Sequence, residues 1–130
     1  MLSTIPASIL KDTLILSVPQ SFNVYMAPTP QVYTVNRVHL QNDNKTTNIN
    51  TGTSGMNSQV TLVGTIFIDA RLSYPRLDYE ALQEQAQASG GVMTCRIRSR
   101  GVLSREFVVN VIDGLPDDEG NLHHWELGVT

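Results

Sequence analysis

The stretch "QVTLVGTIFIDA", residues 59–70, has apolar side chains at every second position, and this period decides the fold class. A period of two places alternate side chains on opposite faces of an extended strand, so one face is expected to be buried. Gly64 interrupts that face and is a candidate position for a bulge. The face expected to be buried carries Val60, Leu62, Ile66, Ile68 and Ala70. Val63 and Phe67 add apolar groups to the opposite face, which we expect the domain or another subunit to cover in part.

Other segments have the alternation or the β-rich composition of strands. They are residues 13–18, 31–41, 92–98, 104–113 and 122–130, with a hairpin turn expected at 99–101. Apolar side chains are expected on the inner face at Met93, Cys95, Ile97, Phe107, Val109, Val111, Trp125, Leu127 and Val129. The lone cysteine, Cys95, is thus expected to be a small core residue.

One segment, "LDYEALQEQAQASGG", predicts a helix at about residues 78–89. Asp78 is suited to cap its N-terminus, and the glycine pair 90–91 supplies a stop. Tyr79, Leu82 and Ala86 form a stripe at helical spacing. The chain is therefore expected to be mainly β, an antiparallel β-sandwich or barrel with this one α-helix packed against it.

The segment "NDNKTTNINTGTSGMNS", residues 42–58, has only Ile49 and Met56 as large apolar side chains. A segment of this composition buries too little surface to order itself, and long loops in compact domains usually have a function or a partner. We therefore expect a long polar loop here. A flexible hairpin tip is the plainer alternative.

The length of 130 residues predicts a single domain, residues 1–130. A net charge of −3 gives no general attraction for nucleic acid or for an anionic membrane. No run of about 20 apolar residues predicts a membrane span, and the N-terminus does not have the pattern of a secretory signal. One cysteine cannot form an intrachain disulfide, so we expect a protein made inside the cell.

The stretch "DGLPDDEGNLHHWEL", residues 113–127, collects acidic residues and two histidines, which raises the question of a metal site. His123 and His124 are neighbours in an expected strand, so we expect them on opposite faces and unable to share one ion. A calcium-loop alignment puts Leu122 where glycine makes the turn and Gly128 where a glutamate closes the site. By contrast, "PDDEGN" has good turn chemistry. We expect a turn followed by a strand, with no metal and no cofactor.

Motifs for common enzyme chemistry, such as Gly-x-Ser-x-Gly, Cys-x-x-Cys or His-Glu-x-x-His, do not occur in the sequence. Asp69, Asp78 and Glu80 could meet near the helix start as an acid/base pair. A strand end and a helix N-terminus explain these carboxylates structurally, and we favour that interpretation. We therefore expect no catalytic residues; an enzyme built on this cluster is an alternative for which no substrate can be named.

Arg96, Arg98 and Arg100 form a basic run in which at least the first two share a sheet face. One interpretation is a contact with phosphate or nucleic acid. The acidic net charge favours the other, a solvated or intersubunit face paired with carboxylates such as Glu106 or Glu126.

Two stretches resemble small structural components of bacteriophage tails. Residues 59–91, "QVTLVGTIFIDARLSYPRLDYEALQEQAQASGG", resemble the strand, short link and helix of the tail-tube-like fold found in tube and baseplate hub proteins. Residues 93–129, "MTCRIRSRGVLSREFVVNVIDGLPDDEGNLHHWELGV", resemble the hairpin and closing strand that follow. The resemblance implies assembly into rings, with long polar loops that reach a neighbouring subunit or ring, and it implies no catalytic residues.

We therefore expect a non-enzymatic virion protein of a phage tail, neck or baseplate, made in the host cytoplasm. Its expected partners are copies of itself in a ring and other virion proteins, with no membrane and no specific nucleic-acid sequence. Candidate contact residues are Asn42, Lys45, Asn48, Ile49, Met56, Val63, Phe67, Arg96 and Arg98. The alternative is a ligand-binding β-sandwich such as a carbohydrate-binding module, for which the available aromatic residues are Tyr25, Tyr33, Tyr74 and Trp125.

Overall fold

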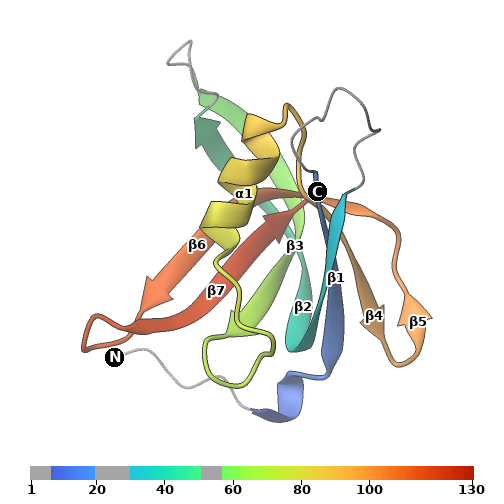
Figure 1. The fold of residues 1–130 in the computed structure, drawn as a ribbon, viewed down its shortest axis with the longest axis vertical. Coiled ribbons are helices and arrows are strands. Elements are labelled where there is room, and N and C mark those ends of the chain that lie inside the picture. Colours follow the sequence, from blue (N-terminus) through green and yellow to red (C-terminus); the bar gives the residue numbers. More distant parts are fainter. Residues whose placement is uncertain (1–6, 20–29, 51–56) are drawn as a thin grey trace.

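The chain is mainly β with one α-helix, as the sequence predicts (Figure 1). The computed structural model describes the backbone of residues 7–19, 30–50 and 57–130, and the side chains of residues 8–19, 30–42 and 61–130. The elements are η1 (Ala7–Ile9), β1 (Asp12–Val18), β2 (Gln31–Asn50), β3 (Asn57–Asp69), α1 (Tyr79–Ala88), β4 (Thr94–Ser99), β5 (Val102–Leu103), β6 (Phe107–Pro116) and β7 (Leu122–Val129).

The strands form an antiparallel barrel, which resolves the choice between sandwich and barrel. Their order is β1-β2-β3-β7-β6-β4-β5, and β1 also pairs with β4, so that six strands close on themselves. The closing register runs from Thr13 opposite Arg98 to Ser17 opposite Thr94. β5 is an extra strand that pairs with β4 alone among the described strands. Closure removes most of the free sheet edges that an open sheet would expose.

β2 bends, so that its first part and its second part pair with different strands. Residues 31–38 pair with β1, and residues 38–50 pair with β3 (Figure 1). The bend falls at Arg37, an extra residue in the β1–β2 register whose φ of 60° lies in the left-handed region. A bulge of this kind bends a strand and increases its twist. The bend is fixed from both sides, because the Ser73 hydroxyl donates to the Arg37 carbonyl and the Asp12 carboxylate accepts the Leu40 N–H.

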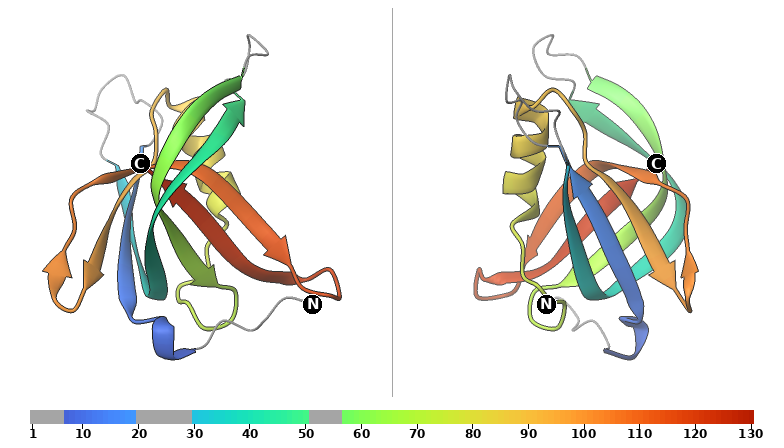
Figure 2. Two further views of the ribbon diagram at one scale, coloured as in Figure 1. Left: turned by 180° about the vertical axis from the view of Figure 1, so that it is seen from behind. Right: turned by 45° about the vertical axis from the view of Figure 1, so that its right-hand side comes forward.

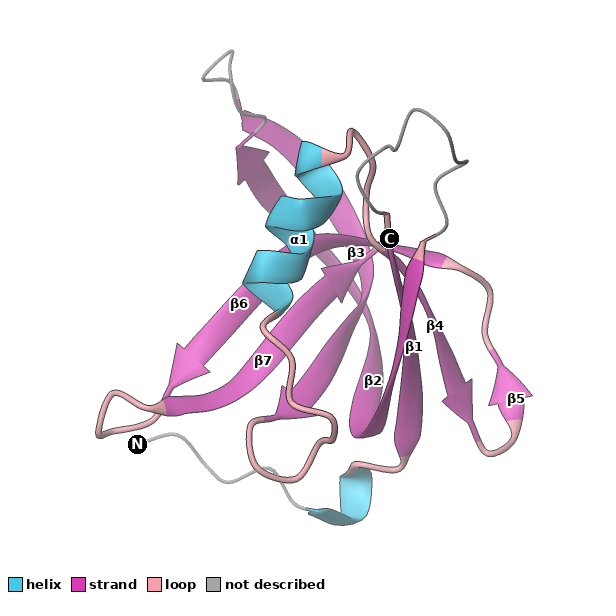
Figure 3. Cartoon of the chain, in the orientation of Figure 1, coloured by secondary structure: helices cyan, strands magenta, loops and turns pink. Residues whose placement is uncertain are grey.

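The core is built from the inward side chains of all six barrel strands and from one stripe of α1. Its buried members are Leu14, Leu16, Val18, Val35, Val38, Ile66, Ile68, Tyr79, Ala86, Met93, Cys95, Ile97, Phe107, Val109, Leu127 and Val129. α1 packs lengthwise against the strands (Figure 3). Its Asp78 cap accepts the Ala81 N–H, and Tyr79 meets Trp125 edge to face with ring centroids 5.4 Å apart. The helical stripe is thus confirmed, and so is the period of two in β3 at Leu62, Ile66 and Ile68. Ala70 is half-buried, and the Val60 side chain lies outside the description.

The long polar loop expected at residues 42–58 is wrong. β2 continues to Asn50 and β3 begins at Asn57, with paired positions from Lys45 opposite Leu62 to Asn50 opposite Asn57. The backbone of residues 51–56 and the side chains of residues 43–60 lie outside the description. Backbone pairing orders these residues without requiring apolar side chains, and threonine favours extended structure. A prediction based on hydrophobicity alone therefore fails to identify a pair of strands whose residues are mostly polar.

A bulge in β6 changes which side chains point inward. Asn110 is an extra residue between the pairs Val109–Val129 and Val111–Gly128. The alternation therefore changes phase, so that Ile112 packs against the core in the place expected for Val111. A second irregularity lies in β2 between Asn42 and Lys45, opposite the position where Gly64 suggested a bulge in β3.

Gly64→Ala is predicted to destabilise the barrel by about 1–3 kcal/mol, the usual range for overpacking. An added Cβ would lie 2.9 Å from Leu40 Cδ1 and 3.2 Å from the Gln41 carbonyl oxygen. The free energy of unfolding, measured by urea titration, tests this, with exposed Thr61→Ala in the same strand as control. If the two variants were equally stable, β2 and β3 would move apart at Gly64 without a loss of stability, which would contradict the prediction.

Candidate functional site

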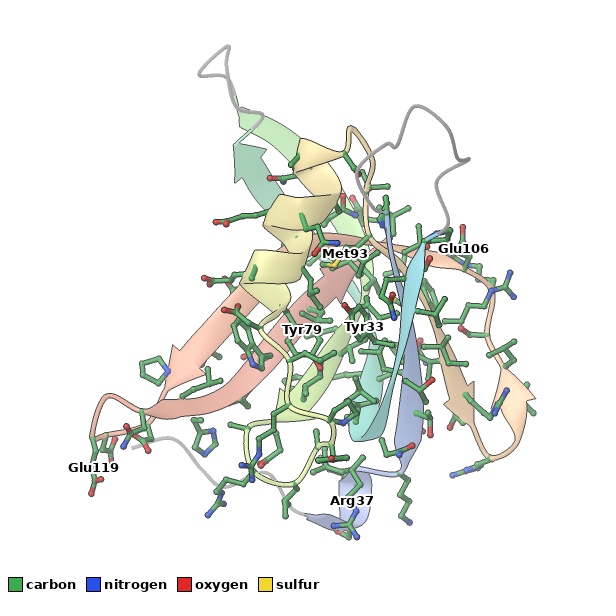
Figure 4. All side chains as sticks on the ribbon, in the orientation of Figure 1. Tyr33, Arg37, Tyr79, Met93, Glu106 and Glu119 are labelled. Carbon is green, nitrogen blue, oxygen red and sulfur yellow. The ribbon has the colours of Figure 1, made fainter. Side chains whose placement is uncertain are left out.

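Residues 117–121 form a rigid, acidic turn at the end of the β6–β7 hairpin. Asp117 organises it, because its carboxylate accepts the N–H groups of Glu119 at 2.8 Å and Asn121 at 2.9 Å. Gly120 adopts a φ of 84°. Figure 4 places Glu119 at the tip, away from the barrel body, where its side chain is exposed. The predicted turn is confirmed, although β6 extends to Pro116 before it begins.

The expectation that His123 and His124 point to opposite faces is wrong. Their Nδ1 atoms are 2.8 Å apart. The physical reason is the register shift after Leu115, which leaves His123 as the extra residue of a bulge. The ring centroids are 5.0 Å apart, so the nitrogens face each other almost head-on. This is the geometry of one shared proton in a hydrogen bond, whereas two ligands of one ion would converge on a third point.

His124 is held in a covered position on the outer face of the barrel, with 7% of its surface exposed. Its Nε2 lies 3.0 Å from a Glu126 carboxylate oxygen. Phe67 lies over it with a centroid distance of 6.3 Å, and His39 stacks on Phe67 from the other side at 6.1 Å. The outer face near Phe67 is therefore covered in part by side chains of the same chain, one of the two origins expected.

The carboxylates proposed as an acid/base alternative each have a structural position. Asp69 is buried, and its carboxylate accepts the N–H groups of Arg71 at 2.8 Å and Leu72 at 2.9 Å. Asp78 caps α1, and Glu80 is exposed in the first turn of the same helix. These contacts support the structural interpretation of the cluster.

The arginine face is exposed and lacks the expected carboxylate partners. Arg96 and Arg98 project outward from β4. Glu126, one expected partner, pairs with His124 instead. Among the side chains that the structure describes, no lysine or arginine forms an ion pair with a carboxylate.

A basic groove lies at the end of the barrel where β1 begins. It has a volume of about 550 Å³ and is lined by Ser8, Ile9, Lys11, Asp12, His39, Leu40, Ser99 and Arg100. Lys11 and Arg100 are exposed, whereas the Asp12 carboxylate is buried and accepts the Leu40 N–H. The sequence does not reveal this groove, because the pairing of β1 with β4 brings Lys11 and Arg100 to the same end of the barrel.

A small cavity of about 50 Å³ lies where α1 begins. Its wall includes Asp69, Tyr79 and Trp125, and the buried Tyr79 hydroxyl has no hydrogen-bond partner among the described residues. Burial raises the pKa of Tyr79 above its ordinary value. The cavity is too small for an organic ligand of ordinary size.

The residues proposed for contacts between subunits lie in three places. Asn42 is exposed on β2. Lys45, Asn48 and Ile49 follow on the same strand, but their side chains lie outside the description. Met56 lies wholly outside the described residues. Val63 and Phe67 are half-buried, and Arg96 and Arg98 are exposed on β4. Of the candidates whose side chains are described, those on β3 and those on β4 lie on strands that do not pair with each other.

The Cys95 thiol is predicted to make the fold less stable at alkaline pH. Burial, with a smaller contribution from Glu106, raises the pKa of Cys95 from 9.0 to about 12. The unfolded chain then loses its proton first, so stability falls as pH rises above about 9, by up to ~1.4 kcal/mol per pH unit. Urea titrations at pH 8 and 10.5 should show a loss about 1–2 kcal/mol larger in the wild type than in Cys95→Ala. Equal losses would contradict the assignment.

Two further kinds of site were considered, a metal site and a membrane-spanning helix. Among the described residues, no three histidine, cysteine, aspartate or glutamate side chains are grouped so that they could hold a metal ion. The one α-helix of the described part is too short and too polar to cross a membrane.

Comparisons with known proteins identify no family. The chain matches no protein-family model, no curated protein and no solved structure.

Proposed function

We propose that the chain is a non-enzymatic structural protein of a phage virion that assembles through copies of itself into a ring. It would belong to a tail, neck or baseplate and contact other virion proteins there. The phage origin rests on the resemblance of residues 59–91 and 93–129 to tail components. The assembly itself rests on one structural observation, the paired ribbon that extends past the barrel.

This ribbon comprises residues 45–50 of β2 and 57–62 of β3. Among the described strands these residues pair only with each other, because β1 pairs with β2 no further than Val38 and β7 first pairs with β3 at Gly64. An isolated two-stranded ribbon is marginally stable in water. It also carries unpaired backbone groups along both edges, which can accept a strand from a neighbouring chain.

Barrel closure limits the sheet edges that a neighbouring copy could pair with. The six barrel strands close on themselves, so each pairs with its two neighbours over part of its length. Among the described strands, free edges remain on the ribbon, on β5, whose Val102 side chain is 69% exposed, and on β6 beyond Val109, where β6 pairs only with β7. Contacts between copies would therefore form at projections from a rigid body, as suits a ring of identical subunits.

A variant with a shortened ribbon is predicted to fold but not to assemble. Residues 46–61 are replaced by Asn-Gly, because Lys45 and Leu62 are paired and a two-residue turn can join paired positions. Light scattering coupled to size exclusion should show wild-type oligomers and a monomeric variant. Thermal unfolding should show that the variant keeps a cooperative transition.

The control replaces only Thr61 by alanine, an exposed position in the ribbon that leaves its length unchanged. This variant is expected to assemble like the wild type. A wild-type chain that stays monomeric at high concentration, also after other virion proteins are added, would contradict the proposed function.

A carbohydrate-binding module is the second candidate, and the aromatic residues give it less support. Such a module needs an exposed aromatic platform, yet Trp125 packs on Tyr79 and Tyr33 is half-buried. Tyr74 is 72% exposed, and Tyr25 lies outside the described residues. We predict that neither the wild type nor the Tyr74→Ala variant binds to a glycan array. Binding that Tyr74→Ala abolishes would favour this candidate over assembly.

A further inference from the structure

Two charged surfaces of opposite sign lie on different sides of the molecule. The acidic turn ends the β6–β7 hairpin, and the basic groove adjoins the β4–β5 turn. Figure 1 and both views in Figure 2 show these two hairpins projecting in opposite lateral directions from the barrel. Neither surface can therefore reach the other within one chain, whereas two copies placed side by side can bring them together.

The groove presents net positive charge, because two cations, Lys11 and Arg100, and one carboxylate, Asp12, are among its lining residues. Lys11 and Arg100 stand at its rim, and neither has an ion pair among the described side chains. Arg100 has a φ of 53° at the β4–β5 turn. The carboxylate that lines the groove, Asp12, is buried and bonded to a backbone N–H. A negatively charged group that enters the groove would meet the two cations at the rim.

The acidic turn has the matching charge. Its carboxylate at the tip, Glu119, is exposed, and residues 113–126 include no lysine or arginine. The hydrogen bonds to Asp117 fix its backbone before any contact forms. A preformed turn loses little conformational entropy on binding, which improves the affinity that a few contacts can give.

Exposed apolar residues flank both surfaces. Val102 and Leu103 follow the groove residue Arg100 after Gly101 and are 69% and 43% exposed. Leu122 follows the acidic turn and is 42% exposed. Ion pairs at an exposed surface contribute little by themselves, so a stable contact requires apolar area beside them. Both sides offer this area next to the charges.

We propose that the acidic turn of one copy docks into the Lys11–Arg100 groove of the next copy, with Leu122 against Val102 and Leu103. This inference rests on the proposed assembly and names the surfaces that join its subunits. The contact is heterologous, because each copy uses a different surface on each side. A heterologous contact produces a closed ring when the rotation between neighbours closes.

The test uses charge reversal on each surface separately. The turn variant is Glu119→Lys, and its control, Glu84→Lys, makes the same charge change on an exposed residue of α1. The groove variant is Lys11→Glu with Arg100→Glu, and its control is Arg71→Glu with Arg76→Glu, both exposed outside the groove. Circular dichroism and thermal unfolding establish that each variant is folded before its association is measured by analytical ultracentrifugation.

Each surface variant is expected to associate about tenfold more weakly than the wild type, and the controls are expected to associate normally. An equimolar mixture of the turn and groove variants should again form complexes, because it contains one intact turn and one intact groove. Wild-type association should weaken as salt rises from about 0.05 to 0.5 M, since exposed charges are screened.

Three results would overturn the inference. If the wild type forms oligomers and both surface variants do so equally well, or if mixing them restores nothing, other surfaces join the copies and the proposed function survives. If the wild type and its mixtures are monomeric throughout, the proposed function fails together with this contact.

Discussion

The pairing of β1 with β4 is the constraint on which the rest of the structure depends. It joins strands that lie far apart in the sequence, with Leu14 opposite Ile97 and Leu16 opposite Cys95. Without it the sheet would be open, and the inward side chains of β1 and β4 would face water on one side. With it, both strands contribute to one core, and most hydrogen-bonding edges are used inside the chain. Assembly then depends on what projects from the barrel.

The elements with a regular period could be predicted from the sequence. The alternation of Leu62, Ile66 and Ile68 indicates a half-buried strand, and each of these side chains is buried. The helix could also be predicted, because Asp78 has the chemistry of an N-cap and α1 begins directly after it. Both predictions use local spacing, which the backbone geometry of a single element determines.

The bulges and the long-range pairings could not be predicted in the same way. A bulge inserts one residue into one strand, so every position beyond it changes face, as Ile112 does after Asn110 and His123 does beside His124. No single-strand pattern reveals which residue will be extra, because the partner strand determines the register. The groove has the same origin, since β1 and β4 must first pair before Lys11 and Arg100 share it.

Ribbon and groove would make different contributions to one assembly. The ribbon offers backbone hydrogen bonds, which have little dependence on side-chain identity and would favour any extended neighbour. The turn and groove offer charge complementarity, which excludes wrong registers because like charges repel. A ring needs both affinity and a defined angle between subunits. In the proposed ring, a preformed turn that is fixed by Asp117 and enters a groove on a closed barrel would constrain that angle better than a two-stranded ribbon, so the charged contact would set the angle between subunits.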